Sequence, residues 1–271
     1  MAAHFEILGE HKQDIFRQYE SWVVPSKELF LKLDSKGPAE GGGINLNLQF
    51  WNKEQVLVKT ESIVLPKTSG VGIKTDSGGT PVFSWRDITG PLVARGTGPT
   101  DPTWATFRNG LKAYQFSVGD EIWVGPLHLD HDFYVGGDLW IHTHYAHNSA
   151  LVTGGTITWG FEISAAQGHQ HGANSVFPAS KTFTVTQTIN PTTQYEHFIS
   201  EGQASIAGGS ATQLDSSLLQ PDTLVMVRVY LSANNMTVSS GGVPEPFLLA
   251  ADGHYQSTST GTKQKAPPFW T

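Results

Sequence analysis

Eight short segments of alternating or continuous apolar residues follow one another between residues 111 and 256. Clusters of Gly, Pro, Asn and Ser separate them, and none of the connections carries an apolar pattern long enough for a crossover helix. Short strands with long, varied connections are typical of antiparallel sheets packed face to face. The sequence therefore predicts an all-β protein, a jelly-roll or Greek-key β-sandwich, with one helical turn at 215–219. The expected strands are 113–118, 121–124, 138–147, 156–164, 182–187, 194–201, 223–232 and 248–256.

The first 43 residues differ from this pattern. Apolar residues at mixed three- and four-residue spacings permit a short helix within residues 10–24, and a Gly- and Pro-containing break follows at 36–43. We interpret residues 1–43 as an N-terminal arm joined by a flexible linker. The alternative, which the sequence leaves open, is an extension packed on its own domain.

Residues 44–110 are expected to add short strands and long aromatic loops to the main domain at 111–256. A strict apolar–polar alternation predicts a strand at 44–50, whereas 68–110 is rich in Gly and Pro and reads as irregular. That stretch carries Trp85, Trp104 and Phe107, so it is not a solvated linker. Aromatic residues in long loops plug the end of a sandwich or contact a partner, and we expect these three at a subunit or capsid interface.

The last residues, 257–271, read as an extended C-terminal tail. Pro267 and Pro268 cannot continue a strand inside a sheet. Phe269 and Trp270 are costly to leave in water, by about 25 cal/mol for each Å² of apolar surface. We therefore expect them to lie against this domain or a neighbouring subunit.

The composition excludes several classes of function. The chain of 271 residues has no cysteine, so it has no disulfide framework, thiolate metal site or cysteine nucleophile. Its formal net charge of -7 argues against nucleic-acid binding by phosphate neutralisation. We find no apolar stretch of membrane-spanning length and no signal peptide at the start, so we expect a protein made in a reducing cytoplasm with no membrane partner.

Histidines provide the strongest candidate for a chemical site. His142 and His144 alternate on one predicted strand, so both imidazoles face the same side, as in known metal sites. The glycine and histidine spacing around them is similar to the first cupin motif, but Asn148 stands where that motif has its carboxylate ligand. The sequence shows no third imidazole in a matching motif, although His169, His171, Asp130 and Asp132 offer further ligand types.

We therefore expect no cofactor and no catalytic residue. His142 and His144 remain candidate ligands of a cupin-like metalloenzyme as one alternative. The preferred interpretation is that they form, with Trp140, a polar and aromatic face between strands or subunits.

Two other site types can be drawn from the sequence. Trp85, Trp104, Trp123 and Tyr134 are of the kind that stack on sugars, although packing in the core or an interface is the preferred interpretation, because most of them lie beside other apolar residues. Carboxylates on predicted strands, Glu162, Glu196 and Glu201, would allow a glycosidase pair, but surface acids on strands are the simpler interpretation. Neither a nucleophile elbow nor a P-loop is present.

Several distinctive runs spread over residues 80–271 carry a family resemblance. They are WRDITG (85–90), PTWATFR (102–108), YQFSVGD (114–120), HDFYVGGDLWIHTHY (131–145), TWGFE (158–162), RVYLS (228–232), HYQST (254–258) and GTKQKAP (261–267). Together they resemble a widespread family of tailed-bacteriophage virion structural proteins, usually found among head and tail genes. The runs carry no known chemistry, so the resemblance implies no catalytic residue.

This resemblance implies a non-enzymatic virion protein. The expectation is a head decoration, or cement, protein that binds the major capsid protein and stabilises the capsid. An arm and a tail suit contacts between neighbouring copies, and a closed cyclic homo-oligomer, with a trimer favoured, is the expected form. The alternative is a tail- or fibre-associated module that binds a host-surface glycan.

Overall fold

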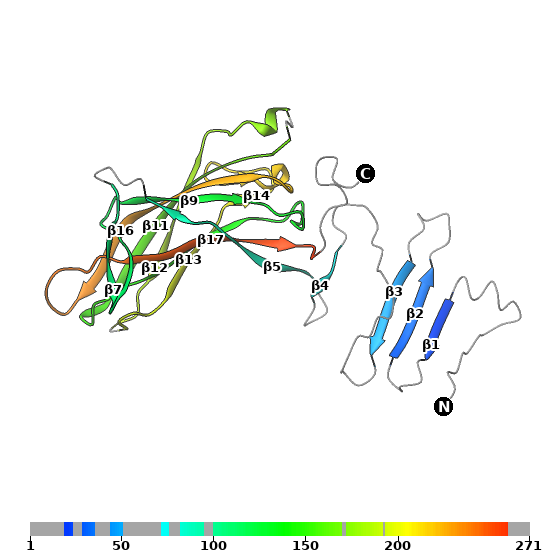
Figure 1. The fold of residues 1–271 in the computed structure, drawn as a ribbon, viewed down its shortest axis with the longest axis horizontal. Helices are drawn as coiled ribbons and strands as arrows, with labels where there is room; N and C mark the ends of the chain where they lie inside the picture. Colours follow the sequence, from blue (N-terminus) through cyan, green and yellow to red (C-terminus); the bar gives the residue numbers. More distant parts are fainter. Residues whose placement is uncertain are drawn as a thin grey trace, which may run out of the picture. The chain divides into compact units, whose positions relative to one another are not determined.

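The computed structural model divides the chain into two compact units, Met1–Pro66 and Lys67–Thr271. Strands dominate both units, as Figure 1 shows. The structure describes the backbone of residues 19–23, 29–35 and 44–50 in the first unit, and residues 72–75, 82–94, 100–169, 172–191 and 193–259 in the second.

The first unit contains a three-stranded antiparallel sheet. Its order is β1 (Tyr19–Val23), β2 (Leu29–Ser35) and β3 (Ile44–Phe50). The strand expected at 44–50 is confirmed as β3. The sheet differs from the expected arm in two respects: β2 pairs with β3 across the proposed boundary at residue 43, and residues 19–23 of the possible helix form β1 instead.

Both differences have a physical reason. A strand with a period-two pattern needs a partner for its backbone N–H and C=O groups, and the Leu-x-Leu-x-Leu run of β2 supplies one next along the chain. Tyr, Trp and Val within β1 are strand-favouring residues, and their preference outweighs an ambiguous helical spacing.

The second unit contains a seven-stranded and a five-stranded sheet. The seven-stranded sheet runs β13–β10–β17–β5–β4, with β8 pairing with β17 and β7 pairing with β8. All of its strand pairs are antiparallel. Its strands are β4 (Lys74–Thr75), β5 (Val82–Thr89), β7 (Thr103–Arg108), β8 (Leu111–Gln115), β10 (Trp140–Ala146), β13 (Phe198–Gln203) and β17 (Phe247–Ser257).

The five-stranded sheet is also antiparallel and runs β12–β11–β16–β9–β6. Its strands are β6 (Leu92–Val93), β9 (Glu121–His128), β11 (Val152–Ala166), β12 (Lys181–Thr188) and β16 (Leu224–Val238). A short parallel pair, β14 (Ser205–Ile206) with β15 (Leu214–Asp215), stands apart from both sheets.

This architecture confirms the all-β prediction. Each of the eight expected strands overlaps a strand of the structure, and the expected turn at 215–219 contains the 3-10 turn Ser216–Leu218, capped by Asp215. The two helical turns among the described residues are far too short to cross a membrane. The order of strands in each sheet departs from sequence order, as in Greek-key connections, while the jelly-roll itself stays a prediction.

The prediction that residues 68–110 are irregular is wrong, because β4, β5, β6 and β7 lie there. The residue pattern of β5 does not identify it as a strand. Only Phe83 and Ile88 are buried, while Trp85 on the outer face is about half exposed. A strand whose outer face carries a tryptophan lacks the clean alternation that identifies half-buried strands.

The two sheets pack face to face around Trp159. Its indole, on β11 of the five-stranded sheet, is fully buried and contacts Tyr145 of β10, with ring centroids 5.5 Å apart. Phe116 covers another side of the indole at 5.2 Å. Burial raises the pKa of the Tyr145 phenol to about 12, so this residue is a neutral member of the core.

A carboxylate fixes the connection between β9 and β10 to strand β17. Asp132 is buried and accepts hydrogen bonds from the hydroxyls of Tyr255 (2.8 Å) and Ser257 (2.5 Å). Arg86 of β5 lies 2.8 Å from the same carboxylate. Burial and the bond to Asp132 raise the pKa of Tyr255, which keeps its hydroxyl a donor.

An arginine joins three strands of the five-stranded sheet. Arg228 on β16 pairs with Glu121 of β9 and with Glu162 of β11, the latter at 2.5 Å. A hydrogen bond from Ser180, together with Arg228, holds the pKa of Glu162 below its ordinary value. Tyr230, the next outward residue of β16, covers Gly160 of β11. Of these residues, all but Glu121 and Ser180 belong to the runs TWGFE and RVYLS.

We predict that Asp132→Asn lowers the free energy of unfolding by about 1.5–3 kcal/mol, because an amide offers one acceptor oxygen where two hydroxyls need one each. Asp138→Asn is the matched control in the same connection, since among the described residues Asp138 accepts a hydrogen bond only from Gln203, and should cost no more than about 0.5 kcal/mol. Urea unfolding of both variants measures the difference. Equal losses would show that the Asp132 network does not hold this connection.

Candidate functional site on the outer face of the seven-stranded sheet

A row of polar and aromatic side chains covers the outer face of the seven-stranded sheet. On β10, Ile141 and Tyr145 belong to the core, so His142 and His144 point the opposite way. The same alternation on β17 places Ala251 in the core and Asp252 on the outer face. Strand pairing sets His142 beside Asp252 on one side and beside Glu201 of β13 on the other.

Two imidazoles and one carboxylate converge within this row. The Nε2 atom of His142 lies 2.6 Å from Asp252 Oδ1, and the Nε2 atom of His144 lies 3.2 Å from the same oxygen. Although it is on the outer face, the His142 side chain is only 2% exposed. One ligand atom from each of the three residues lies within 4.8 Å of the others, which is a spacing suited to a metal ion.

Buried polar atoms in this group lack hydrogen bonds. Neither Asp252 Oδ1 nor His142 Nδ1 has a hydrogen-bond partner among the described residues. Asp252 Oδ1 nevertheless has both imidazole Nε2 atoms in short contact. Burial raises the pKa of Asp252, but close contact with His142 and the charges of the neighbouring histidines outweigh it and leave the pKa below its ordinary value.

A third histidine orients His144. Its Nδ1 atom lies 2.7 Å from the Nε2 atom of His197, and the two rings stack with centroids 4.8 Å apart. When His144 Nδ1 donates this hydrogen bond, the lone pair of its Nε2 atom is free on the side of Asp252. Burial lowers the pKa of His144, which favours this neutral form.

The neighbouring His254 on β17 has both ring nitrogens occupied. Its Nδ1 atom lies 2.5 Å from Glu201 Oε1, and its Nε2 atom lies 2.6 Å from Asp87 of β5. Its ring lies over His142 with centroids 4.2 Å apart. Asp87, His142 and His254 form a second group with the spacing of metal ligands, but Asp87 is 61% exposed.

A shallow depression borders these residues. Trp85, Trp140, Glu201 and His254 line a space of about 400 Å³. The two indoles come from β5 and β10, on either side of β17. Aromatic faces beside a carboxylate and an imidazole are the chemistry that recognises a sugar ring.

A second histidine cluster surrounds Asp222, just before β16. Its Oδ1 atom lies 3.2 Å from His128 Nε2 and 3.1 Å from His131 Nε2, and its Oδ2 atom lies 2.6 Å from His169 Nε2. These imidazoles are a third to a half exposed, unlike that of His142. The cluster is open to solvent, and its three imidazoles contact both carboxylate oxygens of Asp222.

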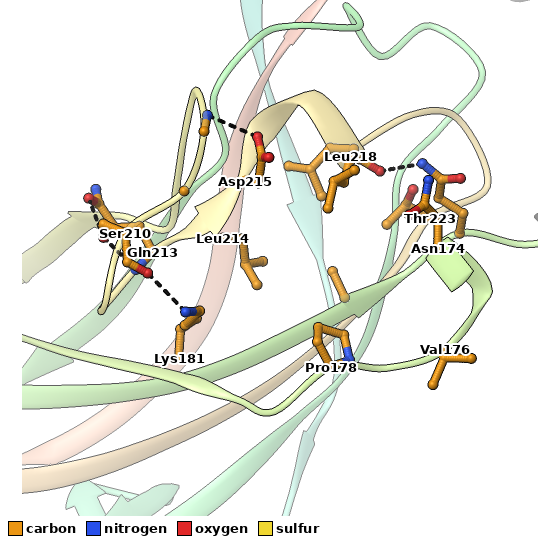
Figure 2. Close-up of a pocket in the computed structure, with 15 residues that line it drawn as sticks. Asn174, Val176, Pro178, Lys181, Ser210, Gln213, Leu214, Asp215, Leu218 and Thr223 are labelled. Carbon is orange, nitrogen blue, oxygen red and sulfur yellow. Dashed lines mark hydrogen bonds between the residues drawn. The ribbon is translucent and has the colours of Figure 1, made fainter. Parts of the chain in front are cut away.

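A separate pocket of about 390 Å³ lies beside β15 and the turn that follows it (Figure 2). Its polar groups bond one another: Lys181 donates to the carbonyl of Ser210 at 2.9 Å, and Gln167 donates to that of Leu218 at 2.6 Å. Val176 and Pro178 contribute apolar surface. Among the described residues that line it, none belongs to a group with metal-ligand spacing.

The sequence placed only part of this site. His142 and His144 do share a face with Trp140, as predicted. The carboxylate beside them belongs to Asp252. Asn148, at the position of the cupin carboxylate, accepts a hydrogen bond from Gln194 through its backbone carbonyl. Asp252 and His254 alternate on the strand expected at 248–256, but nothing in the sequence showed that β17 lies next to β10.

The other candidates are dispersed. Trp104 contacts Tyr114 on the β7–β8 hairpin, and Tyr134 contacts Phe83, so the proposed sugar-binding aromatics do not form one platform. Phe107, expected at an interface, packs within this unit against Phe247 and Tyr195. The three candidate glycosidase acids bond separate partners: Glu162 with Arg228, Glu196 with Asn190 and Glu201 with His254. His171, Phe269 and Trp270 lie outside the described residues.

Comparison with protein-family models, with curated proteins and with solved structures found no match to this chain.

Proposed function

We propose that the protein is a non-enzymatic structural component of a tailed-phage virion, a head decoration protein that binds the major capsid protein. The observation that carries the proposal is the role of the runs on which the family resemblance rests. Asp132, Trp159, Arg228 and Tyr255 all belong to those runs, and all of them hold the sandwich together. These positions serve the fold, and the resemblance of the runs to virion structural proteins supports the proposed role.

The β7–β8 hairpin is the surface best suited to contact the capsid. Alternation along β7 turns Phe107 inward onto Phe247 and Tyr195, while Trp104 is 56% exposed. Leu111, which opens β8, is 68% exposed. Large apolar side chains held out on an anchored hairpin lose their contact with water when a partner covers them, and this burial stabilises the complex.

Removing this apolar surface should weaken attachment to the particle. We expect the Trp104→Ser/Leu111→Ser double variant to bind purified heads at least about tenfold more weakly, since a central aromatic anchor contributes roughly 2 kcal/mol or more. Val176→Ser/Phe177→Ser, which changes another exposed apolar pair elsewhere, is the control and should bind normally. Binding is measured by co-sedimentation with heads that lack the protein.

The cement role itself has a direct test. Particles with the protein should release their DNA at a higher temperature, or at a lower ionic strength, than particles without it. Unchanged head stability, with the protein located only on the tail, would contradict the role. Light scattering of the free protein should give three times the mass of one chain, because a closed trimer fits a local threefold axis of a capsid.

A second candidate function is binding of a host-surface glycan, as in a tail- or fibre-associated module. The depression lined by Trp85, Trp140, Glu201 and His254 favours it. We expect Trp85→Ala to abolish any glycan-array signal, because it removes the most exposed indole of the depression, and Trp104→Ala to leave it intact. An array with no signal for the unaltered protein would eliminate this function.

A further inference from the structure

We propose that His142, His144 and Asp252 bind one divalent transition-metal ion on the outer face of the seven-stranded sheet. The ligand atoms would be the two Nε2 atoms and Asp252 Oδ1. Two imidazoles and one carboxylate are an established ligand set for Zn²⁺ and for other first-row ions. This proposal is independent of the virion function and of glycan binding.

The distances between the ligand atoms already approach those of a metal site. Ligand atoms about 2.1 Å from a tetrahedral metal ion lie about 3.4 Å from one another. His144 Nε2 and Asp252 Oδ1 are 3.2 Å apart, and His142 Nε2 and Asp252 Oδ1 are 2.6 Å apart. A small rotation of the carboxylate away from His142 therefore makes room for the ion.

The unpaired atoms give an independent reason. Asp252 Oδ1 is buried, has two imidazole nitrogens as its nearest polar neighbours, and forms no hydrogen bond within the described chain. Burial of a carboxylate oxygen without an aligned donor is unfavourable. A cation between the three ligand atoms would pair Asp252 Oδ1, whereas the other unpaired atom, His142 Nδ1, lies on the side of Glu201.

The surroundings hold the ligands in place. His142 and His144 project from adjacent outward positions of one strand, and Asp252 projects from the strand paired with it. His197 bonds the second nitrogen of His144, as outer groups do around metal-bound histidines. The second nitrogen of His142 lies 3.9 Å from Glu201, which is within reach of a small side-chain movement.

The two competing groups are less suitable. In the group of Asp87, His142 and His254, both nitrogens of His254 already contact carboxylates, and Asp87 is mostly exposed. Around Asp222, the three imidazoles approach two different oxygens and are more exposed. Within the part of the chain that the structure describes, the group at Asp252 alone combines burial, convergence and an unpaired ligand atom.

The test is a titration of the chelator-stripped full-length protein with Zn²⁺, followed by calorimetry. We expect one ion per chain with high affinity, and at least about tenfold weaker binding in His144→Gln and in Asp252→Asn, because each loses a ligand. His128→Gln is the matched control in the Asp222 cluster and should leave this binding unchanged. Zn²⁺ should also raise the melting temperature of the unaltered protein but not of His144→Gln.

His144 is partly exposed, so His144→Gln is expected to fold, and its melting curve in chelator shows whether it does. Absence of stoichiometric Zn²⁺ binding would overturn the proposal. So would binding that survives His144→Gln, or that is lost only in His128→Gln or in Asp87→Asn. Absorption of the Co²⁺-substituted protein gives a second readout, since its visible bands should disappear in His144→Gln.

Discussion

The face-to-face packing of the two sheets around Trp159 determines the rest of the second unit. The indole fills the space between β11 and β10, so the residues that contact it define the inner face of each strand. Because side chains alternate along a strand, fixing the inner residues also fixes the outer ones. A register shift of one residue on β10 would bring His142 and His144 into the core and expose Ile141 and Tyr145. The outer row of histidines therefore exists in one register only.

Packing also accounts for several residues of the distinctive runs in the sequence. The run at 131–145 contains the carboxylate of Asp132, and the run at 254–258 contains the hydroxyls that bond it. The run at 85–90 contributes Arg86 to the same carboxylate. Residues far apart in the sequence are thus tied together by one buried network, and a change in one run must be tolerated by the other two.

The sequence was sufficient for fold class and for most strands, because period-two alternation and turn clusters are local signals. It was insufficient for β5, whose outer face carries Trp85, and for the first unit, where β2 pairs across a presumed linker. The site was predictable to the same extent. The facing of His142 and His144 follows from one strand, whereas Asp252 joins them through pairing between strands more than a hundred residues apart, which no local pattern encodes.

One side chain on the outer face of the seven-stranded sheet is far more buried than a solvent-facing position requires. His142 is almost wholly covered although it points away from the core, because Asp252, His144 and His254 surround it. Packing alone would be served equally well by apolar or small side chains there, without polar atoms left unpaired. The other polar networks of this unit, at Asp132 and at Arg228, pair their charges with aligned donors. A positive ion held among the convergent atoms of His142, His144 and Asp252 would give this group a role that packing alone does not require.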